Sequence, residues 1–369
     1  MPEEAVRLGI IGVGQIGKRH IESYQKIEGA DIVAIADIDA AHAAAVSERF
    51  GIETVYSDFR ELLEREDIHA VDVCVHNNLH RPVTVAALEA GKHVYCEKPM
   101  AGTLADAAAM WETAQRCERK LSIQLGTLFA METLAAKRLI EEGKLGRLYH
   151  ARSYGFRRRG RPFVDGYGTK SFVKREVAAG GALYDMGVYH IAQLLYLLGL
   201  PEPKRITGRI YQECPMDSKR REESGFDVEE LGCGLVFFEG GLTLDVLESW
   251  AIHMSPFEGS FIAGSEGGVR LSPLSYHTYC ADMVVDGAFD LKEASYRWHQ
   301  LDSTQSAYDS PQHHWIGALR GQVPLEPTAE TALLTMLVSE GVYLSHQLGR
   351  EVTADEVREK SQSTALDLP

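Results

Sequence analysis

The chain has 369 residues and a hydrophobic content of 45%, which is more chain than one core usually serves and an ordinary composition for a globular enzyme of two domains. A net charge of −15 without a long basic stretch argues against nucleic acid or another polyanion as a partner. No apolar run approaches membrane-spanning length, and the acidic start leads directly into a strand, so we expect a cytoplasmic protein without a membrane segment.

The first predicted elements are a strand at 7–11, a glycine-rich turn and a helix at 18–27. This is the order that a dinucleotide-binding turn requires. Gly12 permits the tight turn, Gly14 lets the backbone approach a pyrophosphate, and Gly17 allows the helix to pack closely on the strand. The predicted phosphate-binding residues are Gly12, Gly14, Gln15 and Ile16.

A second strand, predicted at 31–36, ends in Asp37, twenty residues beyond Gly17. An acidic side chain at this place accepts hydrogen bonds from an adenosine ribose and repels a 2′-phosphate. The next residue is Ile38 rather than an arginine, so NAD is favoured over NADP. The alternative is that Asp37 merely caps the following helix, as Asp39 could also do.

Strands and helices continue to alternate up to about residue 125, which predicts a parallel, doubly wound Rossmann sheet. The expected elements are strands at 70–75, 92–96 and 121–125, helices at 82–90 and 104–119, and a polar turn at 76–80. Beyond one more helix at 130–142, longer strands follow that are mostly not separated by helices, as in an antiparallel or mixed sheet. These strands are expected at 148–154, 206–212, 234–238, 242–247 and 259–263. We therefore predict a dinucleotide-binding domain at 1–125 and a substrate-binding and oligomerisation domain at 126–369.

The triplet Glu97-Lys98-Pro99 follows the predicted strand at 92–96. A lysine at the carboxyl end of a Rossmann strand lies in the crevice where such sheets bind their ligands, and the proline fixes the turn after it. The Lys98 ammonium can therefore reach a substrate hydroxyl. A lone lysine at a strand end is more often a solvated surface residue, but the glycine turn and Asp37 reverse that weighting.

The six cysteines have no paired spacing of the kind found in zinc sites or secreted disulfide frameworks, so we expect reduced thiols. The histidines, including His313 and His314, lack the helical spacing of a metal pair. We therefore expect no metal site, although spacing does not address ligands that only folding brings together.

Several motifs together resemble the Gfo/Idh/MocA family of oxidoreductases, over nearly the whole chain. The motifs are Gly12 to Gly17, Asp37, Asn78-Leu79-His80, Glu97-Lys98-Pro99, Gly143 to Gly146, Gly180 to Gly187 and Ala263 to Gly268. The resemblance implies a Rossmann domain followed by an α+β domain with a large, open, mostly antiparallel sheet. It also implies nicotinamide-dependent redox chemistry on a sugar or cyclitol carbon, and a homodimer or homotetramer assembled through the open sheet. By the same resemblance, Asn78, His80, Glu97 and Lys98 bind the cofactor.

One position departs from that family's usual pattern. A histidine usually lies four residues beyond the aspartate of the Asp-x-Gly motif and accepts the substrate's proton, whereas here Tyr189 follows Asp185 at that spacing. In this respect the chain resembles the glucose-fructose oxidoreductase type. In a continuous helix over 185–198, Asp185 and Tyr189 share a face, while His190 is turned away from Tyr189 by about 100°.

These positions suggest a mechanism. A free phenol titrates near pH 10, so Tyr189 needs a nearby cation to act as a base, and Lys98 is the available one. We predict Lys98, Tyr189 and Asp185 as catalytic residues, with Asp185 accepting a hydrogen bond from a neighbouring substrate hydroxyl. His190 is a rival for the acid/base role because histidine titrates near neutral pH, and a packed, non-catalytic histidine is equally compatible with the pattern.

A glycine-rich, arginine-rich segment at 157–170 lies between a strand of the second domain and the Asp185 helix. It could form a lid over the site, in which Arg158 and Tyr167 contact the substrate together with His190. Such a charge run is more often solvated or at a subunit contact.

Together these features predict an NAD-dependent dehydrogenase acting on a secondary ring hydroxyl of a sugar, glycoside or inositol. One variant is a carbohydrate oxidoreductase that never releases NAD. The alternative from another class is a regulatory protein that uses the Rossmann fold to sense a dinucleotide.

Overall fold

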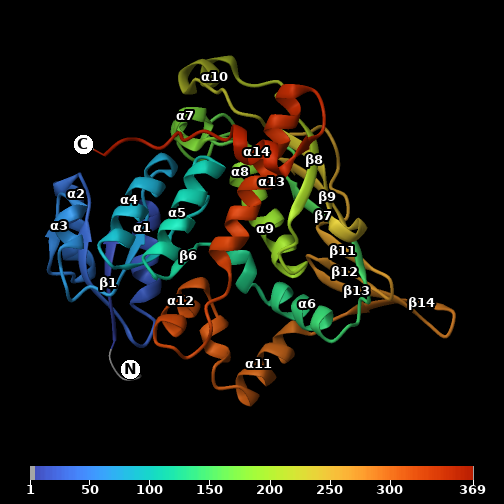
Figure 1. Ribbon diagram of the computed structural model, residues 1–369, viewed down its shortest axis with the longest axis horizontal. Helices are drawn as coiled ribbons and strands as arrows, with labels where there is room; N and C mark the ends of the chain where they lie inside the picture. Colours follow the sequence, from blue (N-terminus) through green and yellow to red (C-terminus); the bar gives the residue numbers. More distant parts are fainter. Residues whose placement is uncertain (1–4, 369) are drawn as a thin grey trace.

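The computed structural model describes residues 5–368, which form two sheets with helices between them (Figure 1). The first sheet has six strands in the order β3-β2-β1-β4-β5-β6, and every neighbouring pair is parallel. Its strands are β1 (Val6–Ile11), β2 (Ala30–Ala36), β3 (Val55–Tyr56), β4 (Ala70–Val73), β5 (His93–Cys96) and β6 (Leu121–Ile123). The helices between them are α1 (Gln15–Tyr24), α2 (Ala40–Phe50), α3 (Phe59–Leu63), α4 (Asn77–Glu89) and α5 (Leu104–Arg116). This is the predicted doubly wound Rossmann sheet.

One element of this domain differs from the prediction. The polar run expected to form a turn at 76–80 instead lies in the first turns of α4, with His76 at the N-cap position. Pro82 is therefore inside the helix rather than at its start. A proline has no N–H to donate to the carbonyl four residues earlier, which here belongs to Asn78. That carbonyl accepts a hydrogen bond from the backbone N–H of Leu366 at 3.0 Å, so the C-terminal segment supplies the missing donor.

The second sheet has nine strands in the order β14-β13-β12-β11-β7-β10-β9-β8-β15. Neighbouring strands are antiparallel except for β7 and β10, which are parallel. The predicted open, mostly antiparallel sheet is thus confirmed. Its strands are β7 (Leu148–Phe156), β8 (Pro203–Tyr211), β9 (Leu231–Phe238), β10 (Thr243–Ser249), β11 (Phe261–Gly264), β12 (Gly268–Leu271), β13 (Leu274–Cys280), β14 (Met283–Ala288) and β15 (Val352–Thr353).

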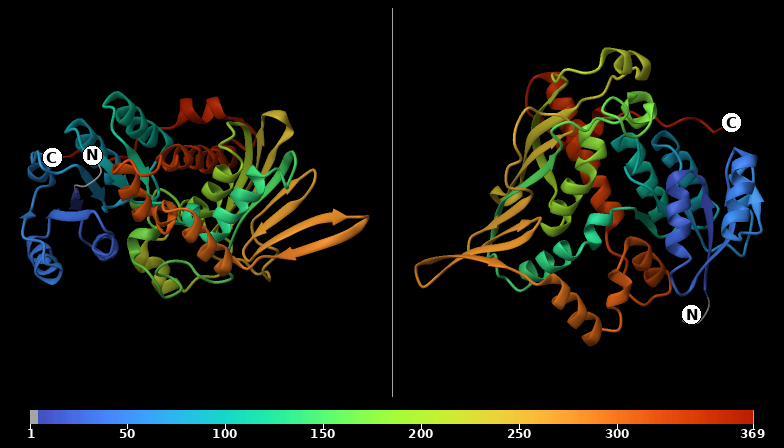
Figure 2. Two further views of the ribbon diagram at one scale, coloured as in Figure 1. Left: turned by 90° about the horizontal axis from the view of Figure 1, so that it is seen from below. Right: turned by 180° about the vertical axis from the view of Figure 1, so that it is seen from behind.

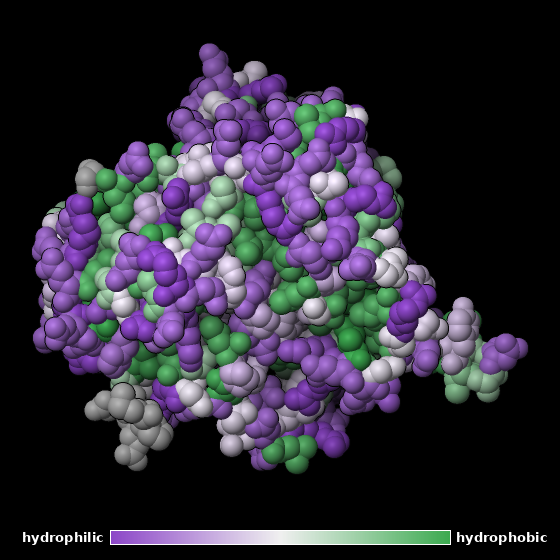
Figure 3. Space-filling model, in the orientation of Figure 1, coloured by the Kyte–Doolittle hydropathy of each residue, from purple (hydrophilic) through white to green (hydrophobic). Residues whose placement is uncertain are grey.

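The helices of the second half are α6 (Met131–Glu141), α7 (Arg175–Ala178), α8 (Ala182–Asp185), α9 (Gly187–Leu197), α10 (Ser218–Ser224), α11 (Leu291–Leu301), α12 (Pro311–Leu319), α13 (Thr328–Leu348) and α14 (Ala354–Lys360). Of these, α6, α8, α9, α13 and α14 pack on one face of the second sheet, and α9 and α13 lie between it and the Rossmann domain (Figure 1). Figure 2 shows that no element of residues 5–368 packs on the opposite face and that the β13–β14 hairpin projects beyond the body. Apolar residues lie on this projection in Figure 3, and Val284 is 73% exposed.

The C-terminal half of the chain also packs directly on the Rossmann domain. Trp315 and Ile316 of α12 are buried in one hydrophobic cluster with residues of β1, β2 and α1. The segment after α14 then runs across the Rossmann domain (Figure 1), where Ser363 and Thr364 donate hydrogen bonds to the buried Asp106 at 2.5 and 3.0 Å.

Within residues 5–368, no helix has the length and apolarity that crossing a bilayer requires. All six cysteines are unpaired, as expected from their spacing.

Candidate active site

The glycine turn has the geometry that the sequence predicts. Gly12 has a φ of +88°, and a Cβ there would lie 2.6 Å from the Cys74 carbonyl oxygen. A Cβ at Gly17 would lie 2.1 Å from the Gly12 carbonyl oxygen, so both positions require glycine. A Cβ at Gly14 would meet nothing within 4 Å, and Gln15 and Ile16 are exposed at the N-terminus of α1. The first N–H groups of a helix have no partner within the helix, so this open cradle fits a dinucleotide pyrophosphate.

Asp37 lies beside this cradle at the carboxyl end of β2. Its Oδ2 accepts a hydrogen bond from the Val13 N–H at 2.9 Å, and its Oδ1 accepts one from the Asp39 N–H at 3.0 Å. The cap of α2 is Asp39, whose side chain accepts from the His42 N–H. Capping therefore does not account for Asp37, and its fixed carboxylate fits the ribose of NAD.

Lys98 follows β5 and meets both of its predicted partners. Its Nζ lies 3.3 Å from Asp185 Oδ1 and 4.8 Å from the centre of the Tyr189 ring. Burial alone would lower the pKa of Lys98, but Asp185, Tyr189 and Glu97 together raise it above its ordinary value. The ammonium is therefore a stable cation beside the phenol.

The helix that carries Asp185 and Tyr189 is broken, which corrects the continuous helix expected over 185–198. Asp185 ends α8, and α9 starts at Gly187, with Met186 between the two helices. A Cβ at Gly187 would lie 3.1 Å from Ile191 Cδ1 and 3.3 Å from Glu248 Cγ, so the chain passes β10 at close range at this point. The Asp185 oxygen that does not face Lys98, Oδ2, accepts a hydrogen bond from Trp250 Nε1 at 3.1 Å.

His190 follows Tyr189 in α9 and has a buried partner of its own on the neighbouring strand. His190 Nδ1 lies 2.9 Å from Oε2 of Glu248, a carboxylate that is fully buried in β10. Glu248 and Trp250 are two residues apart and face the same side of the strand, so His190 and Asp185 contact neighbouring positions on it. Burial lowers the pKa of His190, but Glu248 raises it above its ordinary value overall.

A buried chain of polar groups fixes the residue before Lys98. Glu97 Oε2 accepts from the Lys98 N–H at 2.9 Å, and Glu97 Oε1 lies 2.9 Å from His20 Nε2. The other ring nitrogen of His20 lies 2.7 Å from Asp72 Oδ2. Burial lowers the pKa of His20, but Asp72 and Cys74 raise it well above its ordinary value, so His20 is a cation between two carboxylates. Glu97 thus acts on the backbone of Lys98.

His20 and Asp72 also belong to a set that only folding brings together. The ligand atoms of His20, Asp72 and Cys74 lie within 4.8 Å of one another. Cys74 Sγ is 3.2 Å from Asp72 Oδ1 and 3.3 Å from His20 Nδ1, so hydrogen bonds among the three account for the arrangement.

The two remaining predicted cofactor residues lie on α4. His80 is buried, with its ring nitrogens 2.8 Å from the Pro99 carbonyl oxygen and 3.1 Å from that of Val75. It therefore fixes the turns after β4 and β5 rather than facing a ligand itself. Asn78 accepts from Leu366 at its carbonyl, and its side-chain amide lies 3.5 Å from the Glu176 carbonyl oxygen.

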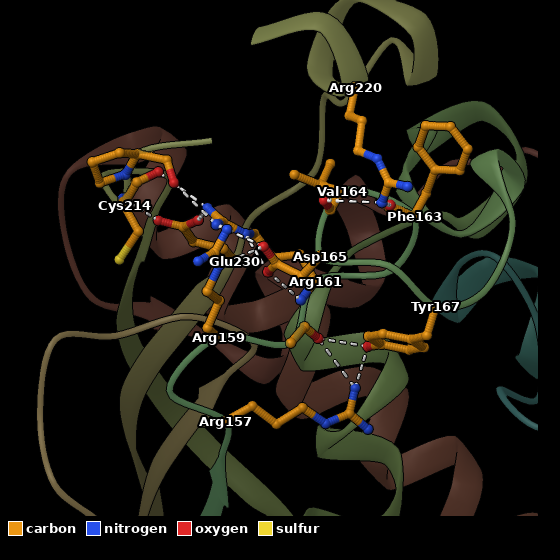
Figure 4. Close-up of polar contacts among 12 residues, drawn as sticks. Arg157, Arg159, Arg161, Phe163, Val164, Asp165, Tyr167, Cys214, Arg220 and Glu230 are labelled. Atoms are coloured by element: carbon orange, nitrogen blue, oxygen red, sulfur yellow. Dashed lines mark hydrogen bonds and ion pairs between the residues drawn. The ribbon is translucent and has the colours of Figure 1, made fainter. Parts of the chain in front are cut away.

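The segment at 157–168 folds into a loop whose side chains make polar contacts with one another and with neighbouring segments (Figure 4). Arg161 is 2% exposed and donates to Asp165 at 2.9 Å and to Glu230 at 2.9 Å. Arg157 is the arginine that points inward, because its guanidinium lies 3.9 Å from Asp185 Oδ2 and donates to the Tyr167 hydroxyl.

The two predicted substrate contacts on this loop differ in position. Tyr167 lies beside Arg157 at the site, with its hydroxyl donating to the Gly160 carbonyl oxygen at 2.6 Å. Burial raises the pKa of Tyr167 to about 12, so it stays a hydrogen-bond donor. Arg158 instead lines a cavity of about 550 Å³ with Met216 and His253. Nothing in the run of arginines at 157–159 distinguishes one from the next, so sequence reasoning could not select Arg157.

Comparisons with known proteins agree with this geometry. Residues 6–125 match the model of the oxidoreductase family with an NAD-binding Rossmann fold, and residues 133–270 match that of the GFO/IDH/MocA C-terminal domain. The chain is 30% identical to D-glucoside 3-dehydrogenase of Escherichia coli K12 over 287 residues, which cover 75% of this chain and 80% of that protein. It is 27% identical to D-apiose dehydrogenase of Paraburkholderia graminis over 351 residues, covering 93% and 88% of the two chains. Levoglucosan dehydrogenase in complex with NADH and levoglucosan shares the fold, with a TM-score of 0.78 at 23% identity over 95% of this chain and 100% of that one.

Proposed function

The chain belongs to the GFO/IDH/MocA family of NAD-binding oxidoreductases, and from that premise we propose that it oxidises a secondary ring hydroxyl of a sugar, glycoside or cyclitol. The observation that carries this proposal is the convergence of Lys98, Asp185 and Tyr189 at the carboxyl end of β5. Relatives that act on D-glucosides, D-apiose and myo-inositol support the substrate class. The cytoplasmic location expected from the sequence is part of the same proposal.

The residues of this chain have separate tasks in the proposed reaction. The glycine turn and Asp37 would hold NAD, which would supply the hydride acceptor. Tyr189 takes the proton of the reacting hydroxyl, because the neighbouring Lys98 ammonium stabilises its deprotonated form. Asp185 accepts a hydrogen bond from an adjacent substrate hydroxyl, since Trp250 and Lys98 fix the orientation of its carboxylate.

A substrate screen tests the proposal. The purified protein is mixed with NAD and with methyl glucosides, free hexoses, myo-inositol or levoglucosan, and the absorbance of reduced nicotinamide is followed. We expect reduction of NAD with at least one of these compounds. Redox cycling between two carbohydrates without added NAD would indicate a retained cofactor. Tight NAD binding with no response to any polyol would contradict the proposal and favour a dinucleotide sensor.

Two substitutions test the assignment of the proton-handling groups. Lys98→Ala and Tyr189→Phe should each lower kcat by about 100-fold or more, because they remove positioned proton transfer. NAD affinity, measured by calorimetry, should stay nearly unchanged. An active Tyr189→Phe variant beside an inactive His190→Ala variant would assign the proton transfer to His190 instead.

A further inference from the structure

A second polar pair lies beside Asp185, and we propose that His190, oriented by Glu248, binds a second hydroxyl of the carbohydrate. This inference rests on the proposed function, because it assigns a specificity residue for that substrate. It implies a polyhydroxylated ring as the preferred substrate rather than a simple secondary alcohol.

The pair is built so that one edge of the imidazole is fixed and the other is available. Glu248 is fully buried, and its Oε1 accepts from the Ser153 hydroxyl at 2.7 Å while its Oε2 faces His190 Nδ1 at 2.9 Å. The carboxylate therefore keeps a proton on Nδ1. The His190 side chain is 29% exposed, so the ring reaches solvent although its Nδ1 edge is buried.

The strand opposite the pair has no side chain where the two residues meet. Gly155 of β7 is paired in register with Glu248. A Cβ at Gly155 would lie 1.8 Å from Glu248 Oε2 and 2.8 Å from His190 Nδ1, so any other residue would displace the pair. Glycine weakens a strand interior and is found there where another group must approach closely.

The pair lies close to the predicted reacting groups. Trp250 directly follows β10 and lies two positions beyond Glu248, a spacing of roughly 7 Å along an extended chain. Trp250 donates to Asp185 and Glu248 holds His190, so the two polar side chains lie side by side. Arg157 is 3.9 Å from Asp185 Oδ2 and is close enough to His190 to lower its pKa. One ring with several hydroxyls can engage both groups.

Protonation of His190 provides a distinctive readout. The charged groups that face it are Glu248 from β10 and Arg157 from the end of β7, with Asp185 and Lys98 beyond them. Because the pKa of His190 is raised, the imidazolium persists to a higher pH than that of a free histidine. Its Nε2–H then gives a charge-assisted hydrogen bond to the hydroxyl, and that bond weakens when the proton is lost.

The test is the pH dependence of KM and kcat for the best substrate of the screen. For the wild type, KM should rise by about 10-fold as pH passes upward through the pKa of His190, while kcat changes little through this step. Glu248→Gln should move the midpoint of that rise to lower pH. His190→Gln should abolish the rise and keep KM near its high-pH value. His299→Gln is the control, since His299 also pairs with a carboxylate, Asp309, at 2.8 Å but lies on α11.

Several outcomes would overturn the inference. The inference fails if the pH profile of KM in His190→Gln matches that of the wild type. It also fails if the His190→Gln substitution lowers kcat and leaves KM unchanged. If the wild type oxidises no carbohydrate, the proposed function fails, and the imidazole ¹⁵N resonances of the NAD-bound protein then decide the present inference. A shift of the Nε2 resonance assigned to His190 on addition of myo-inositol supports it, and an unchanged resonance refutes it. If His190→Gln fails to fold, the same ¹⁵N spectra are recorded for the Glu248→Gln variant instead.

Discussion

A single buried histidine, His20, connects the helix of the glycine turn to the residue before Lys98. We predict that Glu97→Gln, which keeps the shape of the side chain but removes the charge facing His20, lowers kcat several-fold with a small change in stability. His20→Gln should also destabilise the fold by about 3–5 kcal/mol, because it leaves the buried Asp72 carboxylate without its cation. Urea unfolding and steady-state kinetics measure the two effects. An unchanged kcat in stable Glu97→Gln would show that the chain does not position Lys98.

Two arginines share the carboxylate of Asp165 but differ in burial, which gives a matched pair of substitutions. Arg161→Ala should cost about 3–5 kcal/mol of unfolding free energy, since it leaves the buried Glu230 carboxylate without its cation and removes the buried partner of Asp165. Arg159→Ala should cost at most about 1 kcal/mol, because the side chain of Arg159 is 77% exposed. Chemical denaturation checks both values. Equal losses in the two variants would mean that burial does not decide the strength of these pairs.

Among single residues, the sequence predicted those whose position a local motif specifies. Lys98 and Asp37 lie at strand ends, where their position follows from the fold alone. The contact of His190 with Glu248 joins residues 58 positions apart, and its formation depends on a missing side chain at Gly155. A helical wheel cannot contain such a contact, so the sequence could not reveal the partner of His190.

Among the elements, α4 and the C-terminal segment depend on each other through Pro82. In Pro82→Ala, the new N–H can bond the Asn78 carbonyl inside the helix and so competes with Leu366. We predict faster amide hydrogen exchange over residues 361–368, measured by mass spectrometry. Pro311→Ala is the control, because Pro311 occupies the first turn of α12, where a proline frees no carbonyl. Exchange of Leu366 at the wild-type rate in Pro82→Ala would contradict the prediction.

The elements that the sequence misplaced share a physical cause. Apolar periodicity over 185–198 is compatible with one helix, but the close approach of β10 at Gly187 divides it into α8 and α9. Likewise, the polar run at 76–80 has the composition of a turn. Side chains of its first helical residues, Asn77 and Asn78, are instead engaged by the carbonyls of α7, about 100 residues away. Tertiary contacts decided both cases, and local propensity could not reveal them.

For the whole molecule, the uncovered face of the nine-stranded sheet predicts self-association. Thr207, Leu235, Asp245, Arg152 and Phe261 are paired in register across that face. Apolar residues on a sheet face without a covering helix are stabilised when another surface buries them. A second copy of the chain can provide that surface in a dimer with two-fold symmetry. We expect a dimer or tetramer by light scattering, and a smaller species for Leu235→Glu. Leu301→Glu, on the exposed side of α11, should leave the mass unchanged. A monomeric wild type would refute this expectation.

Two histidines, the buried His314 and the half-buried His93, predict how stability depends on pH. His93 Nδ1 accepts from the Lys120 N–H at 2.9 Å and His314 Nε2 accepts from the Glu326 N–H at 2.8 Å, so both rings are neutral in the fold. Burial lowers the pKa of each to about 4. The two neutral rings contribute fully to the free energy of unfolding above the pKa of histidine in the unfolded chain, near 6.5. This contribution is lost as pH falls towards 4, and for His314 the loss is about 2 kcal/mol at pH 5. Urea unfolding at pH 7 and pH 5 should show a smaller pH difference in His314→Gln. An equal difference in that variant would contradict the assignment.

The sequence predicted both sheets and their order along the chain, because alternation of strands and helices in the first third and its loss afterwards are local features. It did not indicate that α12 packs on α1 or that the chain returns to the Rossmann domain after α14. Those contacts join residues more than 200 positions apart, and nothing in either segment alone specifies its partner.

The return of the chain to Asn78 and Asp106 determines when, during synthesis, the Rossmann domain can complete its contacts. A ribosome releases the Rossmann segment long before residues 363–366 are made, so the Asn78 carbonyl and the Asp106 carboxylate lack these donors until that stretch has emerged. Domains generally fold as they emerge, N-terminal first. The nucleotide-binding half of this protein therefore gains its last contacts only once residues 363–366 have left the ribosome.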